Sequence, residues 1–189
     1  MLDLNFLSVL DEKAEFLYRF SDDIWAHPET AFTEFHAAER YCAVLRSEGF
    51  AVTEGLAGIP TAFSGRFGAG RPVIGILAEF DALSGLSQEG GLTEQRSASG
   101  DCGHGCGHNL LGMASLGAAI AVKRFLEENK CPGTVILYGC PGEEGGSGKA
   151  FMARDGVFDE LDAALCWHPD EVTGVGVQTS LANCQVLYK

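Results

Sequence analysis

The spacing of apolar residues changes along the chain, from a helical period to short continuous runs. In residues 3–26 and 33–48, apolar side chains recur every three or four positions with acids between them, which predicts two amphipathic helices. Further on, residues 72–80 are almost uninterruptedly apolar, as in a strand covered on both faces. The other predicted elements are strands at 50–53, 61–67, 134–140, 162–167 (also buried) and 174–188, and helices at 109–129 and 145–154.

Strands and helices alternate from residue 72 to residue 167. This β–α–β–α–β order predicts an α/β fold with a largely parallel, mixed sheet and helices on both faces. Thr33 and Asn109 are the expected N-caps of two of the helices. Functional sites in such sheets lie at the carboxyl ends of the strands. The Gly- and Ser-rich residues 84–107 predict a long functional loop near that edge.

Composition narrows the class of protein. A chain of 189 residues with 46% apolar and 21% charged residues is typical of a globular domain. The net charge of −13 argues against a nucleic-acid partner, which would need a basic surface. The N-terminal segment lacks the basic start of a secretory signal, and the apolar run at 110–122 is too short to span a bilayer. We therefore expect a cytoplasmic protein with no membrane partner, whose seven cysteines are free or metal-bound.

Three short motifs place metal-ligating side chains after predicted strands. Cys106 and His108 offer a thiolate and an imidazole, the ligands that zinc prefers. Glu143 and Glu144 are adjacent carboxylates, and both stay ionised at low cost only near positive charge. One of them could bind an ion while the other serves as a general base. His168, at the end of the last buried run, is the further candidate ligand.

Other interpretations of the same residues stay open. Cys102 and His104 repeat the Cys-x-His spacing, so a structural zinc site of Cys102, His104, Cys106 and His108 is conceivable. It is disfavoured because structural sites usually take their ligands from two separated pairs. A nucleophilic Cys106 or Cys140 would leave the two adjacent glutamates without a role. A non-catalytic chain that serves as a binding scaffold is the remaining alternative.

The motifs together resemble the M20 metallopeptidases, in the amidohydrolase branch and closest to the p-aminobenzoyl-glutamate hydrolases. The similarity rests on HPE at 27–29, AEFDAL at 78–83, GHGCGHNLLG at 103–112 and the segment from YGCPGEEGG to CWHPD at 138–170. It implies a zinc-peptidase-like catalytic domain that binds two divalent ions, zinc or manganese. It also implies hydrolysis of an amide bond in an N-acyl or N-aroyl amino acid or dipeptide-like substrate, such as p-aminobenzoyl-glutamate.

The resemblance assigns a role to each residue of the motifs. It implies that Glu143 is the general base. Glu79-Phe80-Asp81 stands where the wider superfamily has a His-x-Asp ligand motif, so Asp81 is expected to orient the ligands without binding the metal itself. Trp167 and the loop at 84–107 are expected to restrict solvent. The implied metal ligands are Cys106, which bridges the two ions, His108, Glu144 and His168.

Members of the family are longer than this chain. The resemblance therefore implies that residues 1–180 are the N-terminal part of the catalytic domain. Residues 181–189 would begin the connection to a lid and dimerisation domain. Full-length relatives are expected to dimerise through that lid, and a homologous second subunit is a further expected partner.

Overall fold

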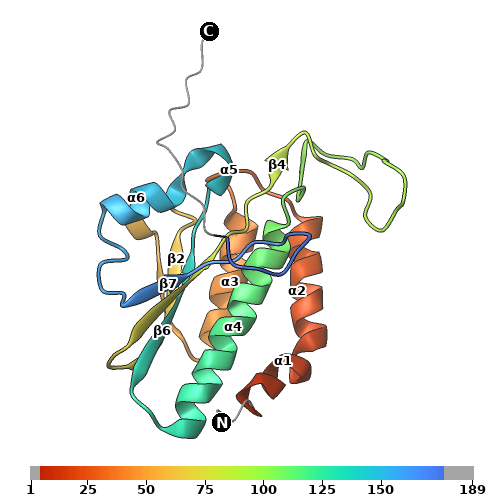
Figure 1. The fold of residues 1–189 in the computed structure, drawn as a ribbon. Coiled ribbons are helices and arrows are strands. Elements are labelled where there is room, and N and C mark those ends of the chain that lie inside the picture. The colour runs from red at the N-terminus through yellow and green to blue at the C-terminus, as the bar shows by residue number, and fades with distance from the viewer. Residues whose placement is uncertain (1–4, 177–189) are drawn as a thin grey trace.

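The computed structural model describes residues 5–176, and its main feature is a five-stranded mixed sheet (Figure 1). The strand order is β1-β2-β6-β3-β7. β3, β6 and β7 run parallel to one another, while β1 and β2 form an antiparallel edge. The predicted α/β fold with a mixed sheet is thus confirmed. The strands of the sheet are β1 (Ala51–Glu54), β2 (Phe63–Ala69), β3 (Val73–Ala78), β6 (Gly133–Gly139) and β7 (Ala163–Leu165).

Helices cover both faces of the sheet. On one face, α3 and α4 pack against the strands and α2 packs against α4, through a cluster that includes Leu45, Leu116 and Leu137. On the other face, Met152 of α6 packs against alternate β6 residues such as Ile136. Every residue of β6 is buried, as its central place requires. The helices are η1 (Asn5–Leu7), α1 (Ser8–Glu12), α2 (Ala14–Ala26), α3 (Phe35–Ser47), η2 (Leu56–Gly58), α4 (His108–Asn129), α5 (Glu143–Gly146) and α6 (Gly148–Arg154).

The strand register brings three loops to one edge of the sheet. Ala78 at the end of β3 pairs with Gly139 at the end of β6, so the two strands leave the sheet at the same level. Leu165 at the end of β7 pairs with Ile76, two residues before the end of β3. The segments that follow these strands therefore lie together at the carboxyl edge, where ligand sites form in parallel sheets.

α4 is the central helix of the fold. By length and composition it could span a membrane, but half of its most apolar stretch is buried inside the protein, where it packs on β3 and β6. Gly112 allows this approach, because a Cβ there would lie 2.6 Å from the backbone oxygen of Glu79. The predicted cap is wrong: the helix begins at His108, and the Asn109 side chain instead donates to Ser21 Oγ of α2 (3.1 Å).

The helix boundaries differ from the predictions at two further places. The N-terminal helix is interrupted at Lys13, which separates α1 from α2. α3 is not capped by Thr33; the Glu29 carboxylate accepts the backbone N–H groups of His36 (2.9 Å) and Ala37 (3.0 Å). A carboxylate from outside the helix thus satisfies the free N–H groups of its first turn.

The elements near the C-terminal end of the described chain also differ from the predictions. The predicted buried strand at 162–167 is shorter and exposed, because no element of the described chain covers β7. The predicted helix at 145–154 is split, with Ser147 in the left-handed region (φ 56°) between α5 and α6. Residues 174–176 form no strand, and the rest of the predicted strand at 174–188 lies outside the described residues. So does the connecting segment at 181–189.

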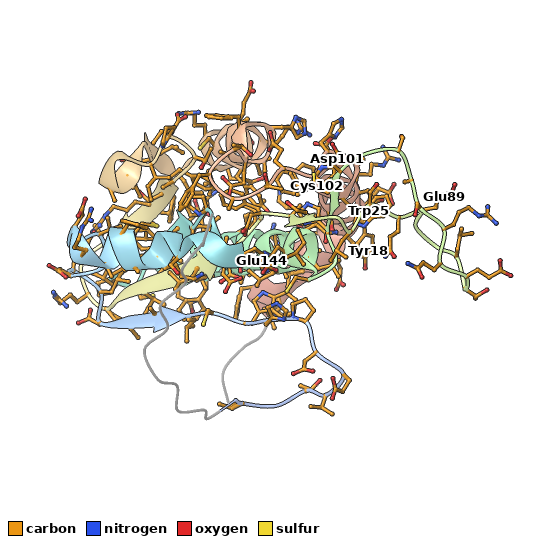
Figure 2. All side chains as sticks on the ribbon, turned by 90° about the horizontal axis from the view of Figure 1, so that it is seen from above. Tyr18, Trp25, Glu89, Asp101, Cys102 and Glu144 are labelled. Atoms are coloured by element: carbon orange, nitrogen blue, oxygen red, sulfur yellow. The ribbon has the colours of Figure 1, made fainter. Side chains whose placement is uncertain are left out.

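The long loop contains the small hairpin of β4 (Leu83–Ser84) and β5 (Cys102–Gly103). Beyond Glu89 the loop projects away from the body of the protein, whereas Gly90 lies against the Trp25 ring and Asp101 and Cys102 lie at the base of the loop near Trp25 (Figure 2). Glu144 lies well away from this projecting tip (Figure 2). The base of the same segment reaches the candidate site, where Gly107 lies against Pro169, and the restriction of solvent by residues 84–107 stays a prediction.

Candidate metal centre

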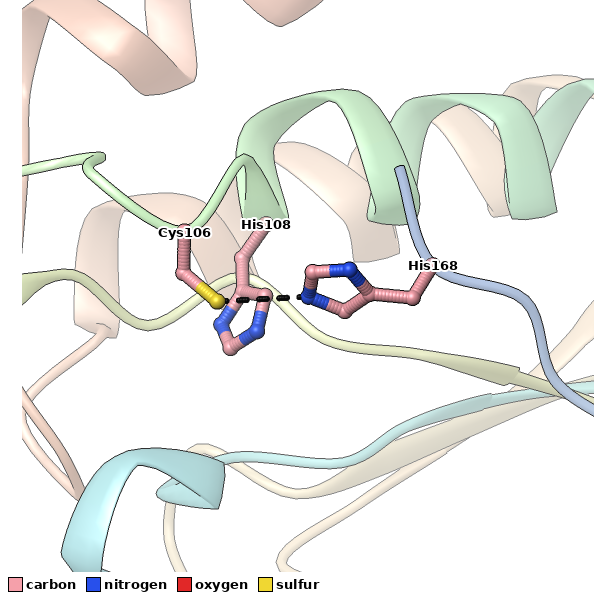
Figure 3. Close-up of side chains that lie close together, drawn as sticks. All are labelled: Cys106, His108 and His168. Carbon is pink, nitrogen blue, oxygen red and sulfur yellow. Dashed lines mark hydrogen bonds between the residues drawn. The ribbon is translucent and has the colours of Figure 1, made fainter. Parts of the chain in front are cut away.

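Cys106, His108 and His168 converge at the carboxyl edge of the sheet (Figure 3). Cys106 lies just before α4, His108 opens that helix, and His168 follows β7. The Cys106 Sγ atom lies 3.2 Å from His168 Nε2, and one ligand atom from each residue lies within 4.8 Å of the others. A thiol and two imidazoles from segments far apart in the sequence thus meet at one point, and this donor set suits zinc.

His108 is oriented by hydrogen bonding to Asp81, the residue that was expected to orient the metal ligands. The ring is fully buried, and its Nδ1 lies 3.1 Å from the Asp81 carbonyl oxygen and 3.0 Å from Asp81 Oδ1. A carbonyl oxygen only accepts, so Nδ1 carries the hydrogen and donates it, and Nε2 of the neutral ring keeps its lone pair. This arrangement, with a carboxylate behind a histidine, is typical of metal sites.

Two buried polar atoms of this cluster have no hydrogen-bond partner. They are His108 Nε2 and Glu144 Oε1. Glu79 Oε2 lies 3.1 Å from His108 Nε2, but this is an ion-pair distance without hydrogen-bond alignment. Buried polar atoms are nearly always hydrogen-bonded, and a cation would satisfy unpaired lone-pair donors such as these. The residues therefore fit a divalent metal ion.

Acidic neighbours set the electrostatics of the cluster. Burial lowers the pKa of His108, but the hydrogen bond to Asp81 and the negative charges of Asp81 and Glu79 outweigh it, so that the pKa is raised. Burial, followed by the Glu144 carboxylate, raises the pKa of the Cys106 thiol to about 11. Neighbouring carboxylates contribute to both shifts, and their negative charge favours a bound cation.

Glu143 and Glu144 differ in their surroundings. Glu144 donates its backbone N–H to Asp81 Oδ2 (2.8 Å), which holds this residue against the β3 loop. Glu143 is 42% exposed, and its Oε2 lies 3.8 Å from His108 Nε2. Burial and the negative charge of Glu79 raise the pKa of Glu143. A half-exposed carboxylate with a raised pKa is suited to receive a proton.

The structure adds Glu79 and Lys149, two residues for which the sequence motifs predicted no role. Glu79 follows β3, is 8% exposed, and forms a second group of possible metal-ligating atoms with His108 and Glu143. Lys149 Nζ lies 2.6 Å from Glu79 Oε1 and neutralises part of this charge. An acid directly after an apolar strand was the signal that could have identified Glu79.

The structural zinc site considered from the sequence is not formed within the described residues. No group of converging ligand atoms in this part of the chain includes Cys102 or His104. Cys102 Sγ donates to the Pro28 carbonyl (3.2 Å). Burial lowers the pKa of His104 to about 4, and neither of its ring nitrogens has a hydrogen-bond partner.

The loop that carries Glu143 is held in place by hydrogen bonds to Glu34. This glutamate is fully buried, and its Oε1 accepts the backbone N–H groups of Phe32 (2.9 Å) and Gly142 (2.8 Å). Its Oε2 accepts the Thr61 hydroxyl (2.8 Å). Gly142 is in the left-handed region (φ 64°), and a Cβ there would lie 2.7 Å from the Phe32 ring. Glu34 therefore fixes the turn from which Glu143 and Glu144 project.

The similarity of the chain to known families decides its classification. Residues 75–183 match the peptidase family M20/M25/M40. The chain belongs to this family. Among curated relatives, it is 55% identical over 170 residues to a subunit of the p-aminobenzoyl-glutamate hydrolase of Escherichia coli (strain K12), covering 89% of this chain and 35% of the relative. It is 31% identical over 187 residues to human Xaa-Arg dipeptidase, covering 90% of this chain and 39% of the relative.

Solved M20 structures share the fold. A dinuclear metal-binding peptidase of family M20 from Bacillus subtilis superposes with a TM-score of 0.67 at 23% identity, over 86% of this chain and 43% of the other. An aminobenzoyl-glutamate utilization protein from Klebsiella pneumoniae superposes with a TM-score of 0.64 at 17% identity, over 86% and 45%. The resemblance drawn from the motifs is thus confirmed for the family and the fold. The chain spans less than half of each of these proteins.

Proposed function

We propose that this chain is part of an enzyme for metal-dependent hydrolysis of the amide bond in an N-acyl or N-aroyl amino acid, such as p-aminobenzoyl-glutamate. The observation that carries the proposal is the convergence of Cys106, His108 and His168 beside a carboxylate with a raised pKa, Glu143. The activity for which the E. coli relative is named supports the substrate class. Because that relative is one subunit of its hydrolase, a homologous second subunit is supported as a partner.

The residues divide into ligands and a base. We propose Cys106, His108, Glu144 and His168 as the ligands of two divalent ions, zinc or manganese, with Asp81 orienting His108. A thiolate favours zinc, while imidazole and carboxylate accept either metal. When bound, such ions polarise the scissile carbonyl and make water a stronger nucleophile at neutral pH.

Glu143 would move the proton in this reaction. Its carboxylate accepts a proton from the attacking water as the water oxygen bonds to the carbonyl carbon. It then donates that proton to the amide nitrogen as the carbon–nitrogen bond breaks, which releases a carboxylic acid and an amine. The raised pKa of Glu143 serves both halves, because the group must bind a proton in one step and return it in the next.

Metal binding by this chain tests the ligand set. The purified chain is dialysed against zinc or manganese, and its metal content is measured by elemental analysis. We expect Cys106→Ala and His168→Ala to lower the metal content and Glu143→Gln to leave it unchanged. Unaltered content in both ligand variants would remove these residues from the site.

Turnover tests the base. Because the chain spans a third of its E. coli relative, the substitution equivalent to Glu143→Gln is made in that full-length hydrolase. We expect hydrolysis of p-aminobenzoyl-glutamate to fall by about 10²–10⁴-fold, the usual contribution of a general base, with metal content preserved. Retained turnover would exclude the glutamate as the base.

A further inference from the structure

A second cluster of possible metal ligands lies where α2 ends and α3 begins. It consists of Asp23, His27 and His36, and one ligand atom from each lies within 4.8 Å of the others. Asp23 lies in the last turn of α2, and His27 directly follows the end of that helix. His36, the second residue of α3, has its ring centroid 4.4 Å from that of His27, with the two rings tilted by 34°. None of the three belongs to the centre formed by Cys106, His108 and His168.

The side chains of this cluster contact one another, and Asp23 is also fixed by Arg40. His27 Nδ1 lies 2.8 Å from the Asp23 carbonyl, so Nδ1 donates its hydrogen and Nε2 keeps the lone pair. Arg40 Nε donates to Asp23 Oδ2 (2.7 Å), which also lies 3.3 Å from His36 Nε2, while Asp23 Oδ1 lies 3.3 Å from His27 Nδ1. Such outer partners are what orient ligands in metal sites.

The backbone around the cluster is also fixed. The Glu29 carboxylate holds the N–H group of His36 (2.9 Å), and the Glu29 carbonyl accepts the N–H of Ala82 (2.8 Å), in the segment that follows β3. His36 therefore has a set position relative to α2. The side chains of His36 and Asp23 are 34% and 25% exposed, whereas His27 is 56% exposed and has room to turn.

We propose that Asp23, His27 and His36 form a second binding site for a divalent transition metal such as zinc. Two imidazoles and one carboxylate are a donor set for borderline metals rather than for magnesium or calcium. Ligand atoms around a single zinc lie roughly 3–3.5 Å apart, given bonds of about 2.1 Å. Binding of a single ion would require the three atoms to move closer than the 4.8 Å limit within which they now lie, and His27 is the most exposed of the three side chains.

Asp23 can serve as an anionic ligand in this cluster. Burial raises the pKa of Asp23, but Arg40 and His36 outweigh it, so the pKa is lowered and the carboxylate is ionised at neutral pH. The chain as a whole carries a net charge of −13. A bound ion would join α2 to α3 beside Pro28, whose carbonyl accepts the Cys102 thiol at the base of the long loop.

Zinc titration of the full chain tests this site. The number of bound equivalents and their affinities are measured by equilibrium dialysis for the unaltered chain and for His27→Gln, His36→Gln and Cys106→Ala. We expect each histidine variant to lose one equivalent, or to bind it at least tenfold more weakly. Cys106→Ala should keep that equivalent while losing zinc at the other centre, so the two proposals fail separately.

Two controls keep the result specific. Glu39→Gln removes an exposed acid from the same helix and should bind as many equivalents as the unaltered chain. Zinc should also shift the imidazole nitrogen resonances of His27 and His36. If His36→Gln keeps every equivalent at unchanged affinity, or if zinc leaves both imidazoles unshifted, the cluster is only a hydrogen-bond network and the proposal is wrong.

Discussion

His108 and His168 face each other across the candidate metal centre, but the fold supports them very differently. Their rings lie 5.7 Å apart in an edge-to-face arrangement. His108 is fully buried at the start of α4 and hydrogen-bonded to Asp81. His168 is exposed, and it follows the three exposed residues of the edge strand β7. One half of the centre is therefore part of the core, and the other half is an exposed arm.

The exposed arm is held by two local contacts. Trp167 Nε1 donates to the Leu111 carbonyl of α4 (3.2 Å). Pro169 lies against Gly107, where an added Cβ would come within 3.2 Å of the proline ring. This difference indicates that metal affinity depends on both halves, while the stability of the chain depends on the buried half alone.

The largest expected effect on stability comes from a substitution in the buried half of the centre. His108→Leu should lower the free energy of unfolding of the metal-free chain by about 3–5 kcal/mol, because it leaves the buried Asp81 carboxylate without its histidine partner. Urea denaturation followed by circular dichroism measures this loss. A loss below about 1 kcal/mol would mean that the Asp81 carboxylate finds other hydrogen-bond partners without His108. The stability of the chain would then not depend on the buried half of the centre.

Asp81 should affect zinc binding without removing a ligand. Asp81→Asn keeps an oxygen for His108 Nδ1–H but removes the negative charge, so we expect zinc affinity to fall about 10–100-fold. Asp162→Asn is a matched control. Asp162 also accepts a backbone N–H, from Val73 (2.7 Å), but at the opposite end of β3. Equal losses in the two variants, measured by competition with a zinc chelator, would show a general effect on the sheet.

The sequence predicted the elements whose side chains repeat with a regular period. β3, β6 and α4 fall within a few residues of their expected ranges because β6, most of β3 and the first half of α4 are buried. The order of these elements was enough to place residues 81, 106, 143 and 168 at one edge of the sheet. Cys106, His108 and His168 could be grouped from ligand chemistry alone.

Features that depend on contacts distant in sequence could not be predicted. Glu29 caps α3 from outside the helix, so the nearer Thr33 was chosen wrongly. β7 has an apolar sequence, but its burial depends on what lies against it, and no described element does. Glu79 and Lys149 are separated by 70 residues, and their pairing exists only after β3 and α6 are in place.

Glu34, which fixes the turn before Glu143, should have a smaller effect on the stability of the fold, and this effect should depend on pH. Burial raises the pKa of this carboxyl despite its hydrogen bonds, so the folded state binds a proton more tightly than the unfolded chain. Its contribution to stability is thus fully present below pH 4.5, the ordinary pKa, and is lost as pH rises through the folded value. Glu34→Gln cannot titrate and should flatten this part of the stability curve.

The measurement for Glu34 is urea denaturation from pH 4 to pH 8, in the unaltered chain, Glu34→Gln and the exposed control Glu39→Gln. Glutamine keeps an oxygen for the Phe32 and Gly142 N–H groups and can donate to the Thr61 hydroxyl, so the variant should fold. If Glu34→Gln follows the same curve as Glu39→Gln, Glu34 does not account for any pH dependence of the fold.

The smallest expected change in stability is on the exposed arm. His168→Leu makes the same substitution as His108→Leu but at an exposed ring, so the free energy of unfolding of the metal-free chain should change by less than about 0.5 kcal/mol. Zinc content should nevertheless fall, because the imidazole beside Cys106 Sγ is lost. The pair of variants therefore separates binding from folding. A loss of stability at His168 as large as at His108 would show that the arm after β7 belongs to the cooperative core, and burial would then be a poor guide to which ligand the fold depends on.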